Sequence, residues 1–430
     1  MARKIIILED SLYKNFYPLT LLRPVYCLRP GIRSLYQVFA YSFADYKPIL
    51  LCRPEIESLV SENCCFPVNQ LDIEPDDEII LINGRLKPNS DLFNAINKAD
   101  VDVLITSGGN LVALKVFGQM TPEQAKSINE GRLDEFIGGL QSRLEEMTID
   151  IRFYEYLWEI VNDIERSLRE DCKFITSQQD FKDSFITGAS KDISMAFPGV
   201  VLVNSQEVYI ARDAQVLPGA VLNASDGPIF IDSEVYIEPH TYIIGPVYIG
   251  RKTRLVGGKI TSCSIGSVCR VGGEVEETII QGYTNKYHAG FLGHAYVGEW
   301  INLGAMTTNS DLRNDYGHVK VSVNGEIIDT GSLKVGSFIG DFTKTAIGTL
   351  LNTGINIGLA CNILGDGLVA EKEIPSFTWY SSRHKMEYKF NKAINTIEKT
   401  MARRDVKLSD SLRKRLEEIY KLRLNPSKEE

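Results

Sequence analysis

The sequence lacks several features that mark common classes of protein. No apolar run approaches the length needed to cross a bilayer, which argues against an integral membrane protein. The chain has 56 acidic and 47 basic residues, which argues against a general nucleic-acid binder. None of the eight cysteines belongs to a C-x-x-C pair, so no zinc site is expected. The first residues lack the apolar stretch of a secretory signal. We therefore expect a cytoplasmic location.

Histidine is also scarce. The chain of 430 residues has five histidines, which limits the choice of a general base: His240, His288, His294, His318 and His384. The length exceeds that of one ordinary compact core, so two or more domains are expected.

The first segment, about residues 1–185, mixes the patterns of strands and helices. Helical spacing of apolar residues runs from Ile32 to Phe43, and Thr121-Pro122-Glu123-Gln124 is typical of a helix start. Four short apolar runs predict strands: Ile5–Leu8, Pro48–Leu51, Glu78–Ile82 and Val101–Thr106. This alternation predicts a mostly parallel α/β sheet.

The second segment, about residues 186–375, carries a repeat of about six residues. Its units pair an aliphatic residue with glycine, as in Ser264-Ile265-Gly266, Phe338-Ile339-Gly340 and Asn356-Ile357-Gly358. This period predicts a left-handed parallel β-helix, with the aliphatic residue inside each coil and the small residue at the corner. The alternative, a β-sandwich, has turn signals at a longer spacing.

The third segment, about residues 376–430, is basic and helical. Amphipathic spacing predicts helices over Lys389–Met401 and Leu408–Leu422. We expect these helices to cap the coil stack or to pack on a neighbouring subunit. Helices that lie on the surface in solvent are the equally weighted alternative.

One window in the second segment resembles a known family. His288 precedes Gly293 by five residues, Asn302-Leu303-Gly304-Ala305-Met306-Thr307 follows, and Asn309-Ser310-Asp311 comes next. This pattern resembles the acetyltransferase domain of bifunctional glucosamine-1-phosphate acetyltransferase / N-acetylglucosamine-1-phosphate uridyltransferase. The chain from about residue 3 to 380 is similar to a related branch of sugar nucleotidyltransferases. Three motifs carry that similarity: Leu19-Thr20 with Arg23-Pro24, Asn83-Gly84-Arg85, and Gly272–Glu277.

The resemblance implies a nucleotidyltransferase-like (Rossmann-like) first domain and an acyl-transfer site in the β-helix. Acetyl-CoA would be the donor and an amino-sugar phosphate the acceptor, in a homotrimer whose sites lie between subunits. His288 matches the family's base, and histidine suits that role because its ordinary pKa lies near neutrality. His294 is its competitor.

Other residues are candidates for binding in the same site. Asn302 and Asn309 could hold the sugar or the amide, although Asn302 could instead fill a corner. The candidates for anion and coenzyme contacts are Lys286, Arg313, Lys320, Lys344 and the coil residue Ala305. For each basic residue, the simpler interpretation is a charge exposed to solvent that binds no ligand.

The first domain departs from the family at two essential places. The glycine-rich phosphate loop is replaced by a stretch that begins Glu9-Asp10, and Arg85 stands where the family has its Mg²⁺-binding Asp. Arg23, Arg29 and Arg85 remain candidates for binding the phosphates of a sugar phosphate or nucleotide. We expect Arg29-Pro30-Gly31 to open a helix, whose N-terminus favours anions. Mg²⁺ binding is possible here, but its usual ligand is replaced.

Three functions therefore remain open. The first is acetyl-CoA-dependent acyl transfer at His288, with a nucleotidyltransferase-like domain of uncertain activity. The second is a sugar-1-phosphate nucleotidyltransferase, using UTP or dTTP, whose β-helix is a trimerisation scaffold. The third is a non-catalytic sugar-nucleotide-binding protein.

Overall fold

The computed structural model describes residues 2–188, 190, 193–365 and 367–424, and the chain forms two compact units. The first unit comprises three segments: Met1–Lys14, Leu22–Leu28 and Arg33–Glu155. The second also comprises three: Asn15–Leu21, Arg29–Ile32 and Tyr156–Glu430. The boundary at Glu155 precedes the expected one at residue 185. Two short N-terminal segments therefore belong with the later part of the chain.

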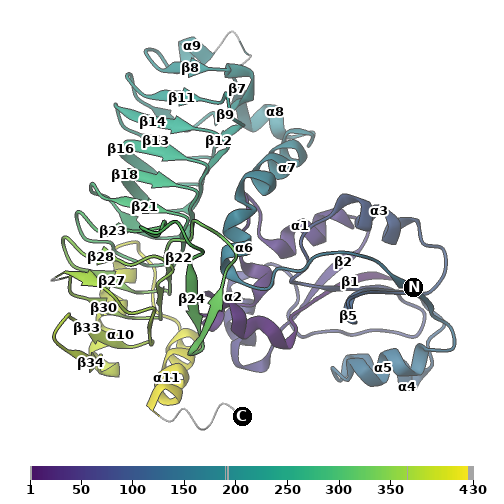
Figure 1. Ribbon diagram of the computed structural model, residues 1–430. Coiled ribbons are helices and arrows are strands. Elements are labelled where there is room, and N and C mark those ends of the chain that lie inside the picture. The colour runs from purple at the N-terminus through teal and green to yellow at the C-terminus, as the bar shows by residue number, and fades with distance from the viewer. Residues whose placement is uncertain (1, 189, 191–192, 366, 425–430) are drawn as a thin grey trace. The chain divides into compact units, whose positions relative to one another are not determined.

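The first unit is an α/β domain built on a six-stranded sheet, in the order β2-β1-β3-β5-β4-β6 (Figure 1). The three neighbouring strands at one side are parallel, as expected, whereas β5 runs antiparallel to both its neighbours. The strand bounds are β1 Arg3–Leu8, β2 Lys47–Leu51, β3 Glu78–Asn83, β4 Val103–Ser107, β5 Asn110–Phe117 and β6 Glu145–Thr148. The four predicted strands are confirmed, and β5 and β6 are additions.

Strand β5 follows β4 through Gly108 and Gly109, whose φ angles are +56° and +82°. Consecutive residues with positive φ form the tight turn that matches the twist of a hairpin, and glycine adopts that conformation without strain. The predicted mostly parallel sheet is therefore interrupted by one hairpin.

The helix start predicted at Thr121 is confirmed. Thr121 accepts a hydrogen bond from the Gln124 amide at the start of α4 (Pro122–Asn129). Helix α1 spans Leu35–Ser42 and has Ser34 as its cap. The remaining helices of this unit are α2 Glu57–Asn63, α3 Ser90–Lys98 and α5 Leu133–Leu140. The predicted helix over 32–43 is thus confirmed, with a later start.

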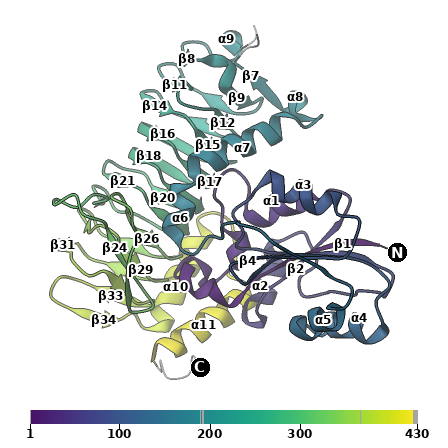
Figure 2. The same ribbon diagram turned by 45° about the vertical axis from the view of Figure 1, so that its right-hand side comes forward.

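The second unit contains the predicted left-handed parallel β-helix, preceded by α6 (Leu157–Asn162) and α7 (Ile164–Thr176). In Figure 2 its coils are stacked one on another. One face is a ten-stranded sheet, in the order β32-β29-β26-β22-β19-β17-β15-β12-β9-β7. The bounds of its strands are β7 Phe185–Thr187, β9 Val208–Ala211, β12 Ile229–Ile231, β15 Val247–Ile249, β17 Ser264–Ser267, β19 Ile279–Gly282, β22 Tyr296–Glu299, β26 Phe338–Ile339, β29 Asn356–Ile357 and β32 Glu373–Ile374. Successive inward residues on this face pair directly and are at most 1% exposed: Ile231, Ile249, Ile265, Ile280, Val297, Ile339, Ile357 and Ile374. This aliphatic ladder forms the core, as the repeat predicted.

The glycines of the repeat have a different role from the expected one. A Cβ on Gly266 would lie 2.0 Å from the Gln281 carbonyl oxygen, and one on Gly358 would lie 2.3 Å from the Ser376 nitrogen. These glycines therefore permit close approach of neighbouring coils. The corner that follows is formed by larger residues with positive φ, such as Trp300 at +61° and Phe342 at +64°. The expectation that the small residue itself forms the corner is wrong on this face.

The chain ends in two helices, α10 (Phe390–Ala402) and α11 (Asp410–Leu424), close to the predicted ranges. The ring of Phe377, in the last coil, lies 6.2 Å from that of Phe390 and 5.3 Å from that of Tyr420. These helices therefore pack on the last coils, which agrees with the predicted cap and not with helices lying free in solvent. In the described part of the chain, no helix combines the length and apolar character needed to cross a membrane.

Candidate functional site

His288 lies in an exposed turn at one corner of the β-helix. The turn connects β20 (Asn285–Lys286) to β21 (Phe291–Gly293). The amide of Met306, in the next coil, donates a hydrogen bond of 2.8 Å to the carbonyl of Ala289. The corner that carries His288 therefore stacks directly on the corner that carries Ala305 and Met306.

Lys286 holds the backbone of this turn from inside. Its side chain is 2% exposed. Its ammonium donates hydrogen bonds to the carbonyls of Gly272 at 2.8 Å, His288 at 2.9 Å and Gly290 at 2.7 Å. Burial lowers the pKa of Lys286 to about 8. Because all three N–H donors of its ammonium are used, Lys286 is not placed to bind an anion. The side chain positions the backbone of the turn and does not make the predicted contact with the substrate.

Two predicted residues lie beside the His288 corner on the following coils. Asn302 pairs with Asn285 on one side and with Lys344 on the other, and its side-chain oxygen accepts a bond of 2.9 Å from the Asn285 amide. Lys344, in β27 (Lys344–Thr345), is half-buried and donates to the Phe342 carbonyl at 3.0 Å. Burial lowers the pKa of Lys344 to about 8. Its charge is therefore partly lost just above neutral pH.

Asn309 is a structural residue of the coil. It lies in β23 (Thr308–Asn309) and is 2% exposed. Its side-chain amide bonds both backbone groups of Gly293, at 2.9 Å in each case. Both ends of the amide are used, so the predicted sugar contact at Asn309 is not supported by this geometry.

His294 is enclosed by two carboxylates. Its Nδ1 lies 2.8 Å from Asp311 Oδ2 and its Nε2 lies 3.1 Å from Glu277 Oε2. Burial opposes the charging of the imidazole, but the two hydrogen-bonded carboxylates prevail and raise the pKa of His294 to about 9. A histidine that keeps its proton at neutral pH is not available as a base. The geometry therefore favours His288 over its competitor.

Asp311 also begins a long excursion from the coils, which contains the hairpin of β24 (Lys320–Val323) and β25 (Glu326–Asp329). Lys320 is exposed on this hairpin, opposite Asp329. Arg313 pairs with Asp315 at 2.5 Å. Neither cation is bonded to the corner that carries His288.

Arg85 is a buried member of an ion pair in the first unit. It is 1% exposed, and its Nε lies 2.8 Å from both carboxylate oxygens of Asp10. One Nη donates to the Tyr154 carbonyl at 2.7 Å, and the guanidinium lies over the Phe153 ring. These bonds account for the arginine in a place where the family has a metal-binding carboxylate. The predicted phosphate contact at Arg85 is not supported.

Glu9, the neighbour of Asp10, is also paired. Its carboxylate lies 2.6 Å from Arg53 Nη1, and burial raises the pKa of Glu9 although Arg53 acts against it. Among the described residues, no cluster of three or more His, Cys, Asp or Glu side chains could hold a metal ion. The two carboxylates that follow β1, Glu9 and Asp10, are each paired with an arginine.

Arg23 and Arg29 lie in different units. Arg23 is half-buried in the first unit. A hydrogen bond with Cys64, together with burial, raises the pKa of the Cys27 thiol, and the charge of Arg23 acts against that rise. Arg29 belongs to the second unit. Its amide donates 2.8 Å to the Tyr296 hydroxyl and its guanidinium lies over Tyr248.

The predicted helix start at Arg29-Pro30-Gly31 is wrong, because α1 begins at Leu35. Gly31 is tightly packed instead, since a Cβ there would lie 2.6 Å from Asp171 Oδ2. The backbone amide of Ile32 donates 2.7 Å to that same carboxylate. This segment therefore anchors to α7 and forms no anion site at a helix terminus.

Comparisons with known proteins agree with the resemblance. Residues 5–180 match the model of a family described as sugar nucleotidyl transferase. A bifunctional sugar-1-phosphate nucleotidylyltransferase/acetyltransferase of Sulfurisphaera tokodaii is 31% identical over an alignment of 160 residues that covers 34% of this chain and 38% of that protein. The bifunctional protein GlmU of Prochlorococcus marinus is 24% identical over an alignment of 222 residues that covers 47% of this chain and 44% of that protein. The chain is similar to these bifunctional proteins over part of its length.

The matched regions span less than half the length of either relative. The GlmU protein of Acaryochloris marina, 30% identical over 163 residues, is matched over 27% of its length and 37% of this chain. The resemblance read from the sequence is therefore confirmed, at low identity, and the two parts of the chain have the folds that it implied.

Sequence reasoning missed the partners of several site residues. The Glu9–Arg53 and Asp10–Arg85 pairs join residues far apart in the chain, which no local motif connects. The Lys286 contacts could not be predicted from the sequence either, because they are made to backbone carbonyls. The sequence did carry a signal for Asp311, which lies four residues beyond the coil that matches the family.

Proposed function

We propose that the β-helix unit transfers an acetyl group from acetyl-CoA to the amine of an amino-sugar phosphate, with His288 as the general base. The imidazole takes a proton as the amine nitrogen attacks the thioester carbonyl. The C–N bond forms, the C–S bond breaks, and the coenzyme leaves as a thiolate that takes up a proton.

The placement of His288 carries this proposal. The residue is exposed, and its backbone is held by the buried Lys286 ammonium at 2.9 Å. A base that must meet an amine within hydrogen-bond reach benefits from a backbone that does not move. The other histidine of the matching window, His294, is held as a cation by Asp311 and Glu277.

The neighbouring coils supply groups suited to the substrates. Asn302 and Ala305 lie on the coil next to His288, and Lys344 lies one coil further. The Ala305 carbonyl accepts a bond of 2.8 Å from the Gly348 amide. We propose that Asn302 contacts the acceptor and that Ala305 and Lys344 contact the coenzyme.

A homotrimer is part of the proposal. Large apolar side chains are exposed on the same corner and on the face beside it: Met306 at 55%, Ile347 at 74%, Leu350 at 44%, Leu364 at 40% and Leu368 at 54%. We call these five residues the apolar stripe. Contiguous exposed apolar residues favour a protein–protein interface. A second copy on this stripe would lie beside His288 and could complete its site.

The test compares two histidines at equivalent corners. His240 is exposed at the corresponding corner of an earlier coil, which lacks the family pattern. The full chain is assayed for coenzyme release from acetyl-CoA with glucosamine 1-phosphate. His288→Ala should lower turnover roughly 10²- to 10⁴-fold, and His240→Ala should leave it unchanged. Equal loss in both variants, or activity of His288→Ala close to wild type, would count against the proposal.

Sugar-1-phosphate nucleotidyl transfer by the first unit is the second candidate, favoured by the family match over residues 5–180. The ion pairs at Asp10 and Glu9 weigh against it. Release of pyrophosphate from UTP or dTTP with a sugar 1-phosphate, unaffected by His288→Ala, would support this candidate.

A further inference from the structure

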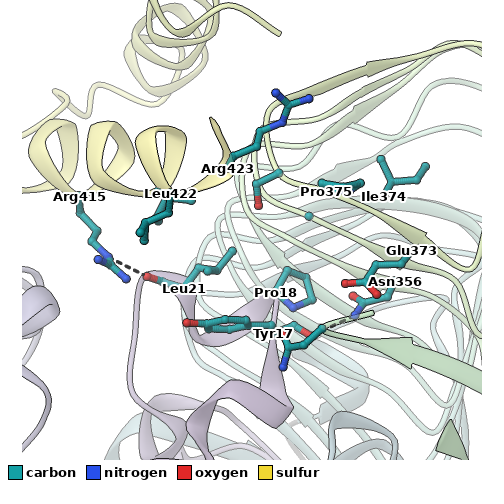
Figure 3. A pocket seen from close by; sticks show the side chains of 14 residues that line it. Tyr17, Pro18, Leu21, Asn356, Glu373, Ile374, Pro375, Arg415, Leu422 and Arg423 are labelled. Carbon is teal, nitrogen blue, oxygen red and sulfur yellow. Dashed lines mark hydrogen bonds between the residues drawn. The ribbon is translucent and has the colours of Figure 1, made fainter. Parts of the chain in front are cut away.

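The second unit contains a cavity of about 580 Å³ at the end of the coil stack (Figure 3). Its walls come from β29 (Asn356–Ile357), β32 (Glu373–Ile374), helix α11 and the segment Tyr17–Leu21. The volume falls within the range of roughly 300–1,000 Å³ that is usual for small-molecule sites. The cavity lies on other coils than His288, and none of its lining residues belongs to the proposed acyl-transfer site.

Two arginines of α11 give the cavity a positive side. Arg415 is 7% exposed, and it is held by the Leu21 carbonyl at 3.3 Å and by Glu418 at 3.2 Å. Arg423 lines the same cavity, and its buried Nε has no hydrogen-bond partner among the described residues. Figure 3 shows that the two guanidinium groups point in different directions, so each is a separate positive point on the lining that suits a phosphate or carboxylate.

The opposite wall offers hydrogen-bond acceptors. Asn356 is 4% exposed, and its Nδ2 donates to the carbonyls of Tyr17 at 3.3 Å and Ser322 at 3.0 Å. Its Oδ1 is buried without a partner in the described part of the chain. A buried acceptor without a hydrogen-bond partner destabilises the fold, and a hydroxyl or N–H group of a ligand would supply that partner. Glu373, held by the Ser322 hydroxyl and the Gly325 amide, adds a carboxylate.

The rest of the lining is apolar and suits the body of a ring. It consists of Pro18, Leu21, Ile374, Pro375, Ile419 and Leu422. A small ion alone would leave this surface and the Asn356 oxygen unused. A purely apolar ligand would leave both arginines unused.

We propose that this cavity is a second ligand site that binds a phosphate monoester attached to a hydroxyl-bearing ring. One of the two arginines, Arg415 or Arg423, binds the phosphate and the other adds positive charge to the lining. Asn356 and Glu373 accept hydrogen bonds from ring hydroxyl groups, and the apolar residues contact the ring. Two sources share this chemistry, a sugar phosphate and a nucleoside phosphate.

Calorimetric titration of the full chain tests the proposal. The probes are glucosamine 1-phosphate, uridine monophosphate, inorganic phosphate, glucosamine and uridine, each also titrated into His288→Ala. We expect a binding event that needs both the phosphate and the ring, that persists in His288→Ala and that is lost in the cavity variants described below. The ester that produces this event identifies the source. Binding that is lost in the cavity variants, while the acetyl-transfer activity of the same variants is kept, separates this site from the proposed acyl-transfer site.

Three variants examine the lining. Arg423→Gln and Arg415→Gln each remove a cation and should weaken the event roughly tenfold or more. Asn356→Asp conserves shape and adds a negative charge, so it should abolish binding of the ester. Arg413→Gln is the matched control, because Arg413 lies on the same helix, is about half exposed and pairs with Glu398.

Thermal unfolding without ligand shows whether each variant is folded. Unchanged binding in Arg423→Gln and Asn356→Asp would overturn the proposal, as would inorganic phosphate binding as tightly as the esters.

Discussion

Buried Arg85 forms an ion pair with the partly exposed Asp10, in which Nε of the arginine lies 2.8 Å from both carboxylate oxygens. Asp10 follows strand β1 and Arg85 follows β3, its parallel neighbour. Each of the two residues differs from the residue type that the resembled family has at that place. Together they neutralise one another at the carboxyl ends of two adjacent strands, where an α/β sheet ordinarily binds its ligand.

Removal of the arginine should destabilise the first unit. Arg85→Met leaves the partly exposed Asp10 carboxylate and the Tyr154 carbonyl without their donor, which costs about 1–3 kcal/mol. Chemical denaturation should show this loss in the free energy of unfolding. Arg132→Met is the control, because Arg132 pairs with Glu130 and Glu135 on the surface, where solvent screens such pairs and they add little to stability. Similar losses in both variants would contradict the assignment.

The His294 cluster should make stability depend on pH. The pKa of His294 rises from 6.5 to about 9 in the folded chain. A raised pKa contributes stability that is fully present below about pH 6.5 and is lost as pH rises through about 9. The difference in unfolding free energy between wild type and His294→Gln should therefore shrink over that window. A difference that stays constant from pH 6 to 10 would show that the imidazole is not charged.

The opposite dependence is expected of the two carboxylates. Hydrogen bonding to His294, acting against burial, lowers the pKa of Glu277 and of Asp311. Their stabilising contribution is present above their ordinary pKa values and is lost as pH falls through the lowered ones. Acid unfolding of Asp311→Asn should therefore vary less steeply with pH than that of wild type, as followed by circular dichroism.

Lys286 should affect acetyl transfer without touching the substrates. Lys286→Met removes the donors to Gly272, His288 and Gly290, and the turn that carries His288 loses its support. We expect kcat to fall while the KM for acetyl-CoA changes little. Lys259→Met, which affects an exposed lysine paired with Glu274, is the control. A rise in KM for the acceptor with an unchanged kcat would instead favour direct binding by Lys286.

The apolar stripe should govern association. Ile347→Asp places a charge at its most exposed residue, so the proposed trimer should dissociate to smaller species in light scattering. Val201→Asp, at another exposed position of the β-helix, serves as the control. A wild-type chain that is monomeric at assay concentrations would contradict the trimer.

The sequence by itself determined the repeating parts of this protein. The ladder from Ile249 to Ile374 is encoded locally, because each coil places its aliphatic residue inside by the same short pattern. The helix beginning after Thr121 is likewise set by a few adjacent residues. The window around His288 could be recognised because the family's spacing lies within one continuous stretch of chain.

The tertiary structure alone decided what each candidate side chain does. Lys286, Asn309 and Arg85 have residue types suited to binding phosphate or sugar, but their partners come from other coils or strands and already use their donors. His288 and His294 lie six positions apart in the sequence. Only His294 is paired with two carboxylates, Glu277 and Asp311, and these residues reach it only because the coils stack. The repeat period predicts which side chains are buried. It does not predict which donors and acceptors already have hydrogen-bond partners, because those partners come from residues distant in the chain.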